Sequence, residues 1–359
     1  MSARFTFSGP VRYRLRSMAE LGRSVVEVSV RRMLRGPRRP GWNWFMEVAT
    51  RMLRTRVNTA MKMSDVNESR RYLNSMAIRS AVLSEVDISP IVRPKFRGSW
   101  FSSKNAEPQA TVLYLHGGGY TFYPQAYADF IAQITLAAKA RTFALDYRLA
   151  PEHRFPAQLE DALHAYRWLL ESGNDSETLI VAGDSAGGNL ALALLLAARD
   201  SNLALPSLAV ALSPPTDFAI DVFANEELDW ITKPELLRWR DWFCDQAQRR
   251  DPLVSPLRAE LQGLPQIYIQ AGCCEILYHS IRAFADRASR QGADVILESW
   301  EDMNHDFQMF GRDVPQSGNA LRRIGEVIGA MCESVTRKKQ LRTERQTGFC
   351  PAFSSEKPL

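Results

Sequence analysis

Short apolar runs alternate with amphipathic segments through the middle of the chain. The runs are rich in Val, Ile, Leu and Ala, have the length of buried strands, and cover 111–115, 142–145, 179–182, 208–212, 266–271 and 295–300. Apolar residues at helical spacing occupy most of the intervals, at 127–140, 157–171, 189–199 and 280–290. Strands that alternate with helices form parallel sheets covered on both faces. The pattern therefore predicts an α/β fold with a mainly parallel sheet.

Four stretches fall outside this alternation. Residues 1–35 have loose helical periodicity, and an amphipathic helix with an aromatic face is expected after the break at 36–41. Two strands are expected between 82 and 100, where they begin the sheet. A long insertion at 217–265 contains a helix near 234–248 and lies where α/β enzymes place lids. Residues 336–359 lack periodicity, which predicts a disordered tail.

The positive charge of the chain is concentrated at its N-terminus. The net charge is +5, yet residues 1–62 contain fourteen Arg and Lys against three Glu, which leaves +11 there and −6 elsewhere. Such a segment fits a solvated surface or peripheral contact with an anionic membrane. No zinc-ligand spacing or RNA-binding motif accompanies the charge, so we expect no nucleic-acid partner.

Cysteine content and hydropathy bound the location of the protein. The five cysteines are odd in number and have no metal-like or framework spacing, which favours a reducing compartment. No apolar run is long enough to span a membrane, and arginines interrupt the region where a signal peptide has its apolar core. We expect a cytoplasmic protein, with peripheral membrane contact as an open alternative.

The strongest chemical signal is Gly183-x-Ser185-x-Gly187, between an apolar strand and an Ala/Leu-rich helix. A tight strand-to-helix turn brings neighbouring backbone too close for side chains two residues before and after the serine. The hydroxyl is then exposed at a helix N-terminus, where the dipole and free N–H groups favour developing negative charge. An ordinary glycine-rich turn is the alternative, but the strand–turn–helix setting favours a nucleophile elbow.

A serine nucleophile needs a base, and His305 is the best placed of five histidines. It follows the last predicted strand, and the order Ser, acid, His is that of an α/β-hydrolase. Glu275 is the first carboxylate after the strand that ends at Gly272, where it could accept the imidazole Nδ1–H. Asp302 and Asp306 stay open as alternative partners.

Three consecutive glycines follow the strand at 111–115, in the motif His116-Gly117-Gly118-Gly119. Consecutive glycines indicate a close approach of backbone, and this loop can aim two N–H groups at an oxyanion. The N–H of Ala186 would supply a third donor. A phosphate-binding loop is the rival, but neither Lys-Ser/Thr nor a Gly-x-Gly-x-x-Gly frame is present.

Three motifs together resemble the hormone-sensitive-lipase-like branch, bacterial family IV, of the α/β-hydrolase carboxylesterases. They cover 116–120, 147–153 and 183–188, and the likeness extends over about 36–311. The resemblance implies a mostly parallel eight-stranded sheet flanked by helices, under a helical cap. It assigns 86–216 and 251–335 to the catalytic domain, 1–85 to a basic N-terminal cap segment and 217–250 to a cap insertion.

The resemblance also implies roles for single residues. It makes Ser185 the nucleophile, His305 the base, Glu275 the orienting acid, Gly118, Gly119 and Ala186 the oxyanion donors, with support from His116, Gly117 and Asp184. The family commonly has Asp-Pro-Leu where this chain has Glu275-Ile276-Leu277, so the acid is one methylene longer here. Four tryptophans of the cap are candidates to line an acyl pocket: Trp42, Trp44, Trp239 and Trp242.

These features predict a serine carboxylesterase that acts on short- to medium-chain acyl esters through an acyl-enzyme, without metal or nucleotide cofactor. An amidase or deacetylase could use the same triad, because pocket shape sets the substrate. A small-molecule receptor on the same scaffold is less favoured, since receptors of this resemblance typically lose the base. The natural ester and the oligomeric state stay open, with a homodimer among the alternatives.

Overall fold

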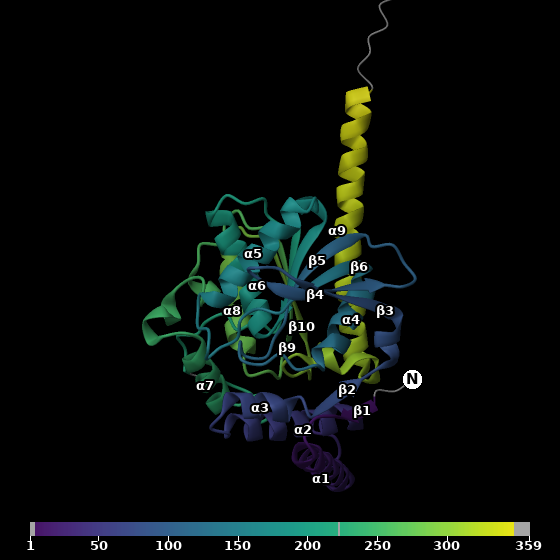
Figure 1. Cartoon of the computed structure of the whole chain (residues 1–359), viewed down its shortest axis with the longest axis vertical. Coiled ribbons are helices and arrows are strands. Elements are labelled where there is room, and N and C mark those ends of the chain that lie inside the picture. Colours follow the sequence, from purple (N-terminus) through teal and green to yellow (C-terminus); the bar gives the residue numbers. More distant parts are fainter. Residues whose placement is uncertain (1–3, 222, 348–359) are drawn as a thin grey trace, which may run out of the picture.

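An eight-stranded sheet runs through the body of the protein (Figure 1). The computed structural model describes residues 4–221 and 223–347. The strand order is β10-β9-β8-β7-β5-β6-β4-β3, and β4 alone runs in the direction opposite to the other seven strands. The strands are β3 (Val86–Val92), β4 (Arg97–Ser103), β5 (Ala110–Leu115), β6 (Ala140–Leu145), β7 (Leu179–Asp184), β8 (Leu208–Leu212), β9 (Gln266–Gly272) and β10 (Val295–Trp300). The predicted mostly parallel sheet is confirmed.

Helices cover both faces of this sheet, which explains why its central strands are apolar throughout. Helices α4 (Tyr127–Ala138) and α9 (Pro315–Thr347) pack on one face, with Ile180 and Ala182 of β7. Helices α5 (Ala157–Glu171) and α6 (Ala186–Asp200) pack on the other face, with Leu179 and Val181. Helix α8 (Tyr278–Arg290) covers β9 on that second face. Short 3₁₀ helices are η2 (Ser176–Thr178), η3 (Gln246–Arg250), η4 (Pro256–Arg258) and η5 (Phe307–Asp313).

The strand register gathers the candidate site residues at one edge of the sheet. Leu115 pairs with Gly183, Asp184 pairs with Leu212, and Gly272 pairs with Trp300. The carboxyl ends of β5, β7, β8, β9 and β10 therefore lie side by side. This is the edge where parallel α/β sheets bind ligands.

The N-terminal residues form a separate layer beside that edge (Figure 1). Its elements are β1 (Arg4–Phe7), α1 (Val11–Arg35), α2 (Trp44–Met61), α3 (Val66–Leu73) and β2 (Met76–Arg79). The 3₁₀ helix η1 (Ala81–Glu85) follows and packs on the body through Val82. Strands β1 and β2 pair in a small antiparallel sheet, and α1 is the outermost helix. From the insertion, α7 (Lys233–Phe243) joins this layer, because its Trp239 packs with Val57 and Met61 of α2.

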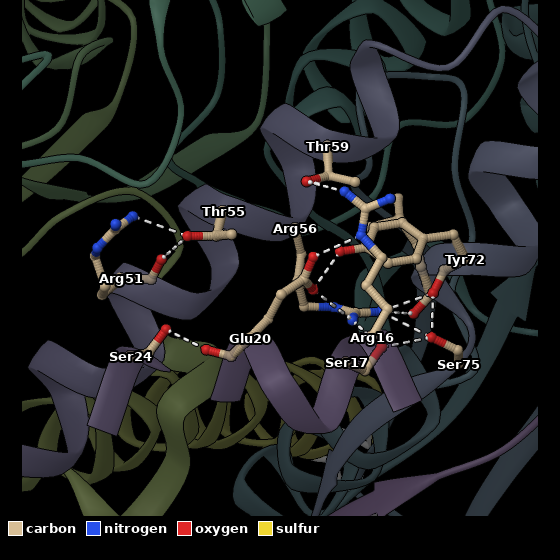
Figure 2. A network of polar contacts seen from close by, with 11 residues as sticks. Arg16, Ser17, Glu20, Ser24, Arg51, Thr55, Arg56, Thr59, Tyr72 and Ser75 are labelled. Carbon is tan, nitrogen blue, oxygen red and sulfur yellow. Dashed lines mark hydrogen bonds and ion pairs between the residues drawn. The ribbon is translucent and has the colours of Figure 1, made fainter. Parts of the chain in front are cut away.

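One buried guanidinium ties the N-terminal helices together (Figure 2). Arg56 of α2 is 3% exposed and donates to Ser17 of α1, to the carbonyl oxygen of Tyr72 at 2.7 Å and to Ser75 Oγ at 3.3 Å. The Tyr72 hydroxyl in turn donates to Glu20 of α1. Burial lowers the pKa of Arg56, against the opposing effects of Tyr72 and Glu20. Side chains from three helices therefore share one polar centre.

The C-terminal segment differs from its predicted disorder. Helix α9 continues to Thr347 and projects beyond the body (Figure 1). The sequence places strong helix formers, Lys, Arg, Gln and Glu, at 337–346, and these extend a helix whose start is anchored by Leu321, Ile324 and Ile328. High helix propensity and an anchored start are thus sufficient to continue α9, although this part of the helix has no apolar face. Residues 348–359 of the predicted tail lie outside the described residues.

Candidate active site

Ser185 occupies a sharp turn between β7 and α6. Its backbone has φ 49° and ψ −121°, a conformation that non-glycine residues rarely adopt and that costs free energy. A Cβ on Gly187 would lie 1.9 Å from the carbonyl oxygen of Leu115, so only glycine fits there. The Ser185 N–H donates to the carbonyl oxygen of Leu212 at 2.8 Å. The geometry is that of the predicted nucleophile elbow.

His305 lies in the loop after β10, with its ring fully buried. Its Nε2 is 2.8 Å from Ser185 Oγ, which is hydrogen-bond distance for proton transfer. The Trp230 indole N–H donates to the carbonyl oxygen of His305 at 2.6 Å and helps to fix the loop. The structure thus brings together the predicted nucleophile and base, which are 120 residues apart in sequence.

Glu275 follows β9 and is fully buried on the other side of the imidazole. Its Oε2 lies 3.8 Å from His305 Nδ1, longer than a hydrogen bond, and accepts from Ser213 Oγ at 2.6 Å. Glu275 Oε1 and His305 Nδ1 have no hydrogen-bond partner within the described residues. Both atoms are therefore available for the expected contact.

The two alternative acids have different positions. Asp302 accepts from Arg39 Nε at 2.7 Å and from the N–H of Gly41 at 2.8 Å, so it ties the α1–α2 linker to the loop after β10. Asp306 Oδ2 lies 3.3 Å from His305 Nε2, on the side of Ser185 rather than of Nδ1. Of the three carboxylates, only Glu275 faces the ring nitrogen that an orienting acid must hold.

Buried carboxylates dominate the electrostatics around the imidazole. Burial alone lowers the pKa of His305, but Asp306, Glu275 and Asp229 outweigh it and raise this pKa to about 9. Burial raises the pKa of Glu275 to about 8, opposed by His305. These shifts belong to one buried pair. Three nearby acids stabilise the imidazolium form, and for this reason the pKa of His305 is raised.

Asp229, in the cap insertion, was not predicted as part of the site. Its Oδ2 accepts from the N–H of Ile276 at 2.7 Å, and its Oδ1 accepts from the N–H groups of Trp230 at 2.7 Å and His305 at 3.3 Å. Burial raises the pKa of Asp229, opposed by His305. One side chain therefore joins the insertion both to the loop after β9, which carries Glu275, and to the loop after β10, which carries His305. No sequence signal singled out Asp229, because two other acids, Glu226 and Glu227, stand beside it.

The glycine loop leaves selected N–H groups free. The Gly117 N–H donates to Asp184 Oδ1 at 3.0 Å and is therefore occupied. The N–H groups of Gly118, Gly119 and Ala186 donate to no other group in the part of the chain that the structure describes. Gly119 has φ +61°, and a Cβ there would lie 2.6 Å from the Trp239 ring. Gly118, Gly119 and Ala186 can thus serve as donors to an oxyanion.

Two buried side chains hold this loop from behind. Asp184 accepts from the hydroxyls of Tyr114 at 2.6 Å and Tyr127 at 2.9 Å, and burial together with nearby Asp306 raises its pKa to about 7. The His116 ring is stacked between Tyr123 and Tyr147, with centroids 3.7 and 4.0 Å away. Burial lowers the pKa of His116 to about 3, so its ring is neutral. Both arrangements fit the supporting roles that the resemblance implied.

An apolar cavity of about 150 Å³ opens beside the glycine loop. Its lining includes Met52, Leu53 and Val57 of α2, Met76 and Ile78 of β2, and Phe122, Trp230, Trp239, Met309 and Phe310. Of the four candidate tryptophans, only Trp239 lines it. Trp42 packs with Met303 and Phe307, Trp44 is 44% exposed, and Trp242 contacts the cluster around α7. Trp230 was missed, because the sequence does not show which side of the insertion faces inward.

The described residues contain neither a metal-binding group of side chains nor a membrane-spanning helix. Within 4–221 and 223–347, no group of three or more His, Cys, Asp or Glu side chains is arranged to hold a metal ion. Over the same residues, no helix has both the length and the apolar character needed to cross a membrane.

Known proteins share this fold and much of this sequence. The family model described as "alpha/beta hydrolase fold" matches residues 112–309. An acetyl-hydrolase of Streptomyces hygroscopicus is 38% identical over 233 residues, which cover 63% of this chain and 76% of that protein. An esterase of Acinetobacter venetianus is 30% identical over 247 residues, 67% of this chain and 81% of that protein.

Solved structures extend the likeness to nearly the whole chain. A crystal structure of an esterase from the bacterial hormone-sensitive lipase family superposes with a TM-score of 0.68 and 31% sequence identity. The match covers 88% of this chain and 98% of that one. The chain belongs to the α/β-hydrolase family. Within it, the resemblance to the hormone-sensitive-lipase branch is confirmed, and the protein is a carboxylic ester hydrolase.

Proposed function

We propose that the protein hydrolyses short- to medium-chain acyl esters through an acyl-enzyme formed on Ser185. The observation that carries this proposal is the 2.8 Å contact between His305 Nε2 and Ser185 Oγ at the turn before α6. A serine hydroxyl becomes an effective nucleophile only when a base takes its proton. The free N–H groups of the glycine loop lie beside the same turn and would receive the negative charge that develops.

The first half-reaction follows from these positions. Ser185 Oγ attacks the ester carbonyl carbon while its proton passes to His305 Nε2. The carbonyl oxygen becomes an oxyanion, which accepts from the N–H groups of Gly118, Gly119 and Ala186. The C–O bond to the alcohol then breaks, and the imidazolium gives its proton to the leaving oxygen. The products are the free alcohol and acyl-Ser185.

Water completes the cycle by the reverse sequence. His305 takes a proton from water, the resulting hydroxide attacks the acyl carbon, and the imidazolium returns the proton to Ser185 Oγ as the carboxylic acid leaves. Glu275 acts from the other side of the ring. A closure of the 3.8 Å gap to Nδ1 would fix the tautomer and stabilise the imidazolium in both half-reactions.

The size of the apolar cavity supports the expected range of acyl length. It measures about 150 Å³, is bounded by α2 and β2, and includes Gly118 in its lining. An acyl chain that enters it buries apolar surface against Met52, Ile78 and Phe122. A cavity of this volume fits a short or medium acyl chain better than a long one.

The direct test is turnover of p-nitrophenyl esters from acetate to palmitate. We expect an optimum at short or medium acyl length, and Ser185→Ala should lower kcat by about 10⁴-fold or more. Ser289→Ala is the matched control, since Ser289 is exposed on α8 and should leave activity unchanged. Wild-type rates in Ser185→Ala would overturn the proposal.

A second candidate is the removal of acetyl groups from N- or O-acetylated small molecules. It is favoured by the 38% identical relative that is described as an acetyl-hydrolase. The triad would be the same, with an amine or alcohol as leaving group. Turnover of an acetate ester, compared with turnover of the acetamide whose leaving group differs only in nitrogen for oxygen, would separate an esterase from an amidase. A receptor without chemistry is the third alternative, and turnover dependent on Ser185 would exclude it.

For partners, we infer a small-molecule acyl ester as substrate and peripheral contact with a membrane through the basic N-terminal segment. Support for the membrane contact comes from the charge of residues 1–62, which contain fourteen Arg and Lys against three Glu. Contact between two copies of the chain in a homodimer is the alternative role for the N-terminal segment.

A further inference from the structure

Helix α1 exposes more large apolar side chains than the rest of the described chain together. It carries seven of the twelve in residues 4–221 and 223–347, namely Val11, Leu15, Met18, Val26, Val30, Met33 and Leu34. Met33 is 86% exposed and Leu34 is 77% exposed. Single exposed apolar residues are ordinary on a protein surface, but a contiguous group of this size marks an interaction site.

These side chains lie on one side of the helix. At 3.6 residues per turn, Val11, Leu15, Met18, Val26 and Met33 fall within about a quarter of its circumference. The buried residues of α1 are on the opposite side, where Ser17 contacts Arg56 of α2. Val30 and Leu34 widen the strip at the C-terminal end, and the strip is about 35 Å long. Figure 1 shows α1 as the outermost helix of its layer.

Positive charge borders this apolar strip. Arg12, Arg16, Arg23 and Arg35 are exposed on α1, which has seven arginines and two glutamates in total. Both glutamates are already paired. Glu20 accepts from Arg16 at 3.0 Å and from the Tyr72 hydroxyl, and Glu27 accepts from Arg51 of α2 at 2.9 Å. Arg12 in turn pairs with Glu68 of α3 at 3.0 Å, so Arg23 and Arg35 supply the positive charge beside the strip.

We propose that α1 lies in the interface of an anionic membrane, with this apolar strip among the acyl chains and its arginines at the headgroups. A second copy of the chain fits less well, because a two-fold contact would place arginine-bordered surfaces against each other. The inference deepens the membrane contact in the proposed function. It is independent of the chemistry at Ser185.

Helix α2 connects this surface to the candidate active site. Helix α2 contacts α1 through Arg51 and Arg56, and Arg56 lines the apolar cavity together with Met52 and Leu53. A bound membrane would therefore lie one helix away from the acyl-binding cavity. Acyl esters dissolved in the bilayer are the class of substrate that such an arrangement would bring within reach.

The test is co-sedimentation of the full chain with phosphatidylcholine vesicles, with and without an equal amount of phosphatidylglycerol. Wild-type protein should bind the anionic vesicles, and Leu15→Glu/Met33→Glu should weaken this binding by about tenfold or more. Val92→Glu/Ile296→Glu is the matched control, because it adds the same charge at exposed apolar residues of β3 and β10. Arg23→Gln/Arg35→Gln should weaken binding to anionic vesicles while it leaves binding to neutral vesicles unchanged.

Two further measurements separate the outcomes. Turnover of soluble p-nitrophenyl acetate should be the same in all variants, so a failure of the esterase assignment would be seen apart from a failure of membrane binding. Analytical ultracentrifugation reports the oligomeric state. A dimer that Leu15→Glu/Met33→Glu dissociates, without vesicle binding by the wild type, would overturn the proposal in favour of a second copy. A monomer that binds no vesicles would also overturn it.

Discussion

At the scale of single residues, the imidazole of His305 lies between carboxylates on its two sides. Glu275 faces Nδ1, whereas Asp306 lies 3.3 Å from Nε2 on the nucleophile side. In the proposed mechanism, His305 must be neutral to take a proton from Ser185. Every nearby negative charge therefore raises the pH above which the enzyme is active, and also stabilises the imidazolium formed during the reaction.

Asp306→Asn should move the acidic limb of the pH profile of kcat/KM to lower pH by about one unit. The pKa of His305 is raised to about 9, and the change removes one of the acids that raise it, so the neutral base is populated at lower pH. Glu301→Gln removes a charge from an exposed position of the same loop and is the control. Coincident profiles for Asp306→Asn and wild type would show that Asp306 does not influence the base.

Glu275→Gln should lower kcat by about a hundredfold or more with little change in KM. The amide cannot stabilise the imidazolium as a carboxylate does, while the cavity that binds the acyl chain is unaltered. Glu275→Asp restores the charge and should recover part of the rate. If Glu275→Gln were as active as the wild type, the orienting role would pass to another acid.

At the scale of elements, the sequence predicts well those strands and helices that have continuous or periodic apolar residues. It does not predict short elements that form only through contacts with other parts of the chain. Strands β5, β7 and β8 are apolar along their length because helices cover both faces, so their sequence is sufficient to place them. Helix α3 and strands β1 and β2 are short, and they form because α1, α2 and Arg56 pack on them. Ser185, Glu275 and His305 each follow a strand in the expected order, which is why sequence could propose them together.

Asp229 was beyond reach of the sequence for a physical reason. Its partners are backbone N–H groups at Ile276 and His305, 47 and 76 residues away, and backbone donors leave no mark in a sequence. Trp230 was also beyond reach of the sequence, because it lines the cavity together with residues of α2 and the glycine loop that are distant in the chain. The insertion could be read as a lid, but not as a support for the acid and base loops.

Asp229→Asn should lower kcat several-fold and the melting temperature by about 2–8 °C, because at least one buried N–H loses its acceptor. Both loops that carry the acid and the base would then be less well fixed. Glu227→Gln, at an exposed position of the same insertion, is the control for the change of charge. Normal activity and stability in Asp229→Asn would show that the insertion does not hold the two loops.

At the scale of the whole molecule, the helices of the N-terminal layer are joined to one another by buried polar contacts as well as by apolar packing. Arg56 carries several of them, from α2 to α1 and to the chain after α3 (Figure 2). Removal of a buried guanidinium leaves its former acceptors without donors, which costs more than the contacts themselves contributed. The layer should therefore depend on this residue more than its sequence position suggests.

Arg56→Met should lower the melting temperature by about 4 °C or more and loosen the N-terminal helices first. Limited proteolysis would detect this as early cleavage within residues 11–73, ahead of the sheet. Arg51→Met is the matched control, because Arg51 on the same helix is 41% exposed and pairs with Glu27 at the surface. Equal stability and equal cleavage in the two variants would contradict a central role for Arg56.

The link between Asp302 and the α1–α2 linker has a consequence for synthesis of the chain. Arg39 and Gly41 leave the ribosome early, but the carboxylate that binds them follows 263 and 261 residues later. Contacts of such large sequence separation form late in folding. The contact of the linker with Asp302 can therefore form only after translation has passed residue 302, whereas the contacts of Arg70 with Thr121 and Glu152 can form earlier. His305, the proposed base, lies in the same late stretch, so this anchor of the N-terminal layer and the proposed triad are both completed near the end of biogenesis.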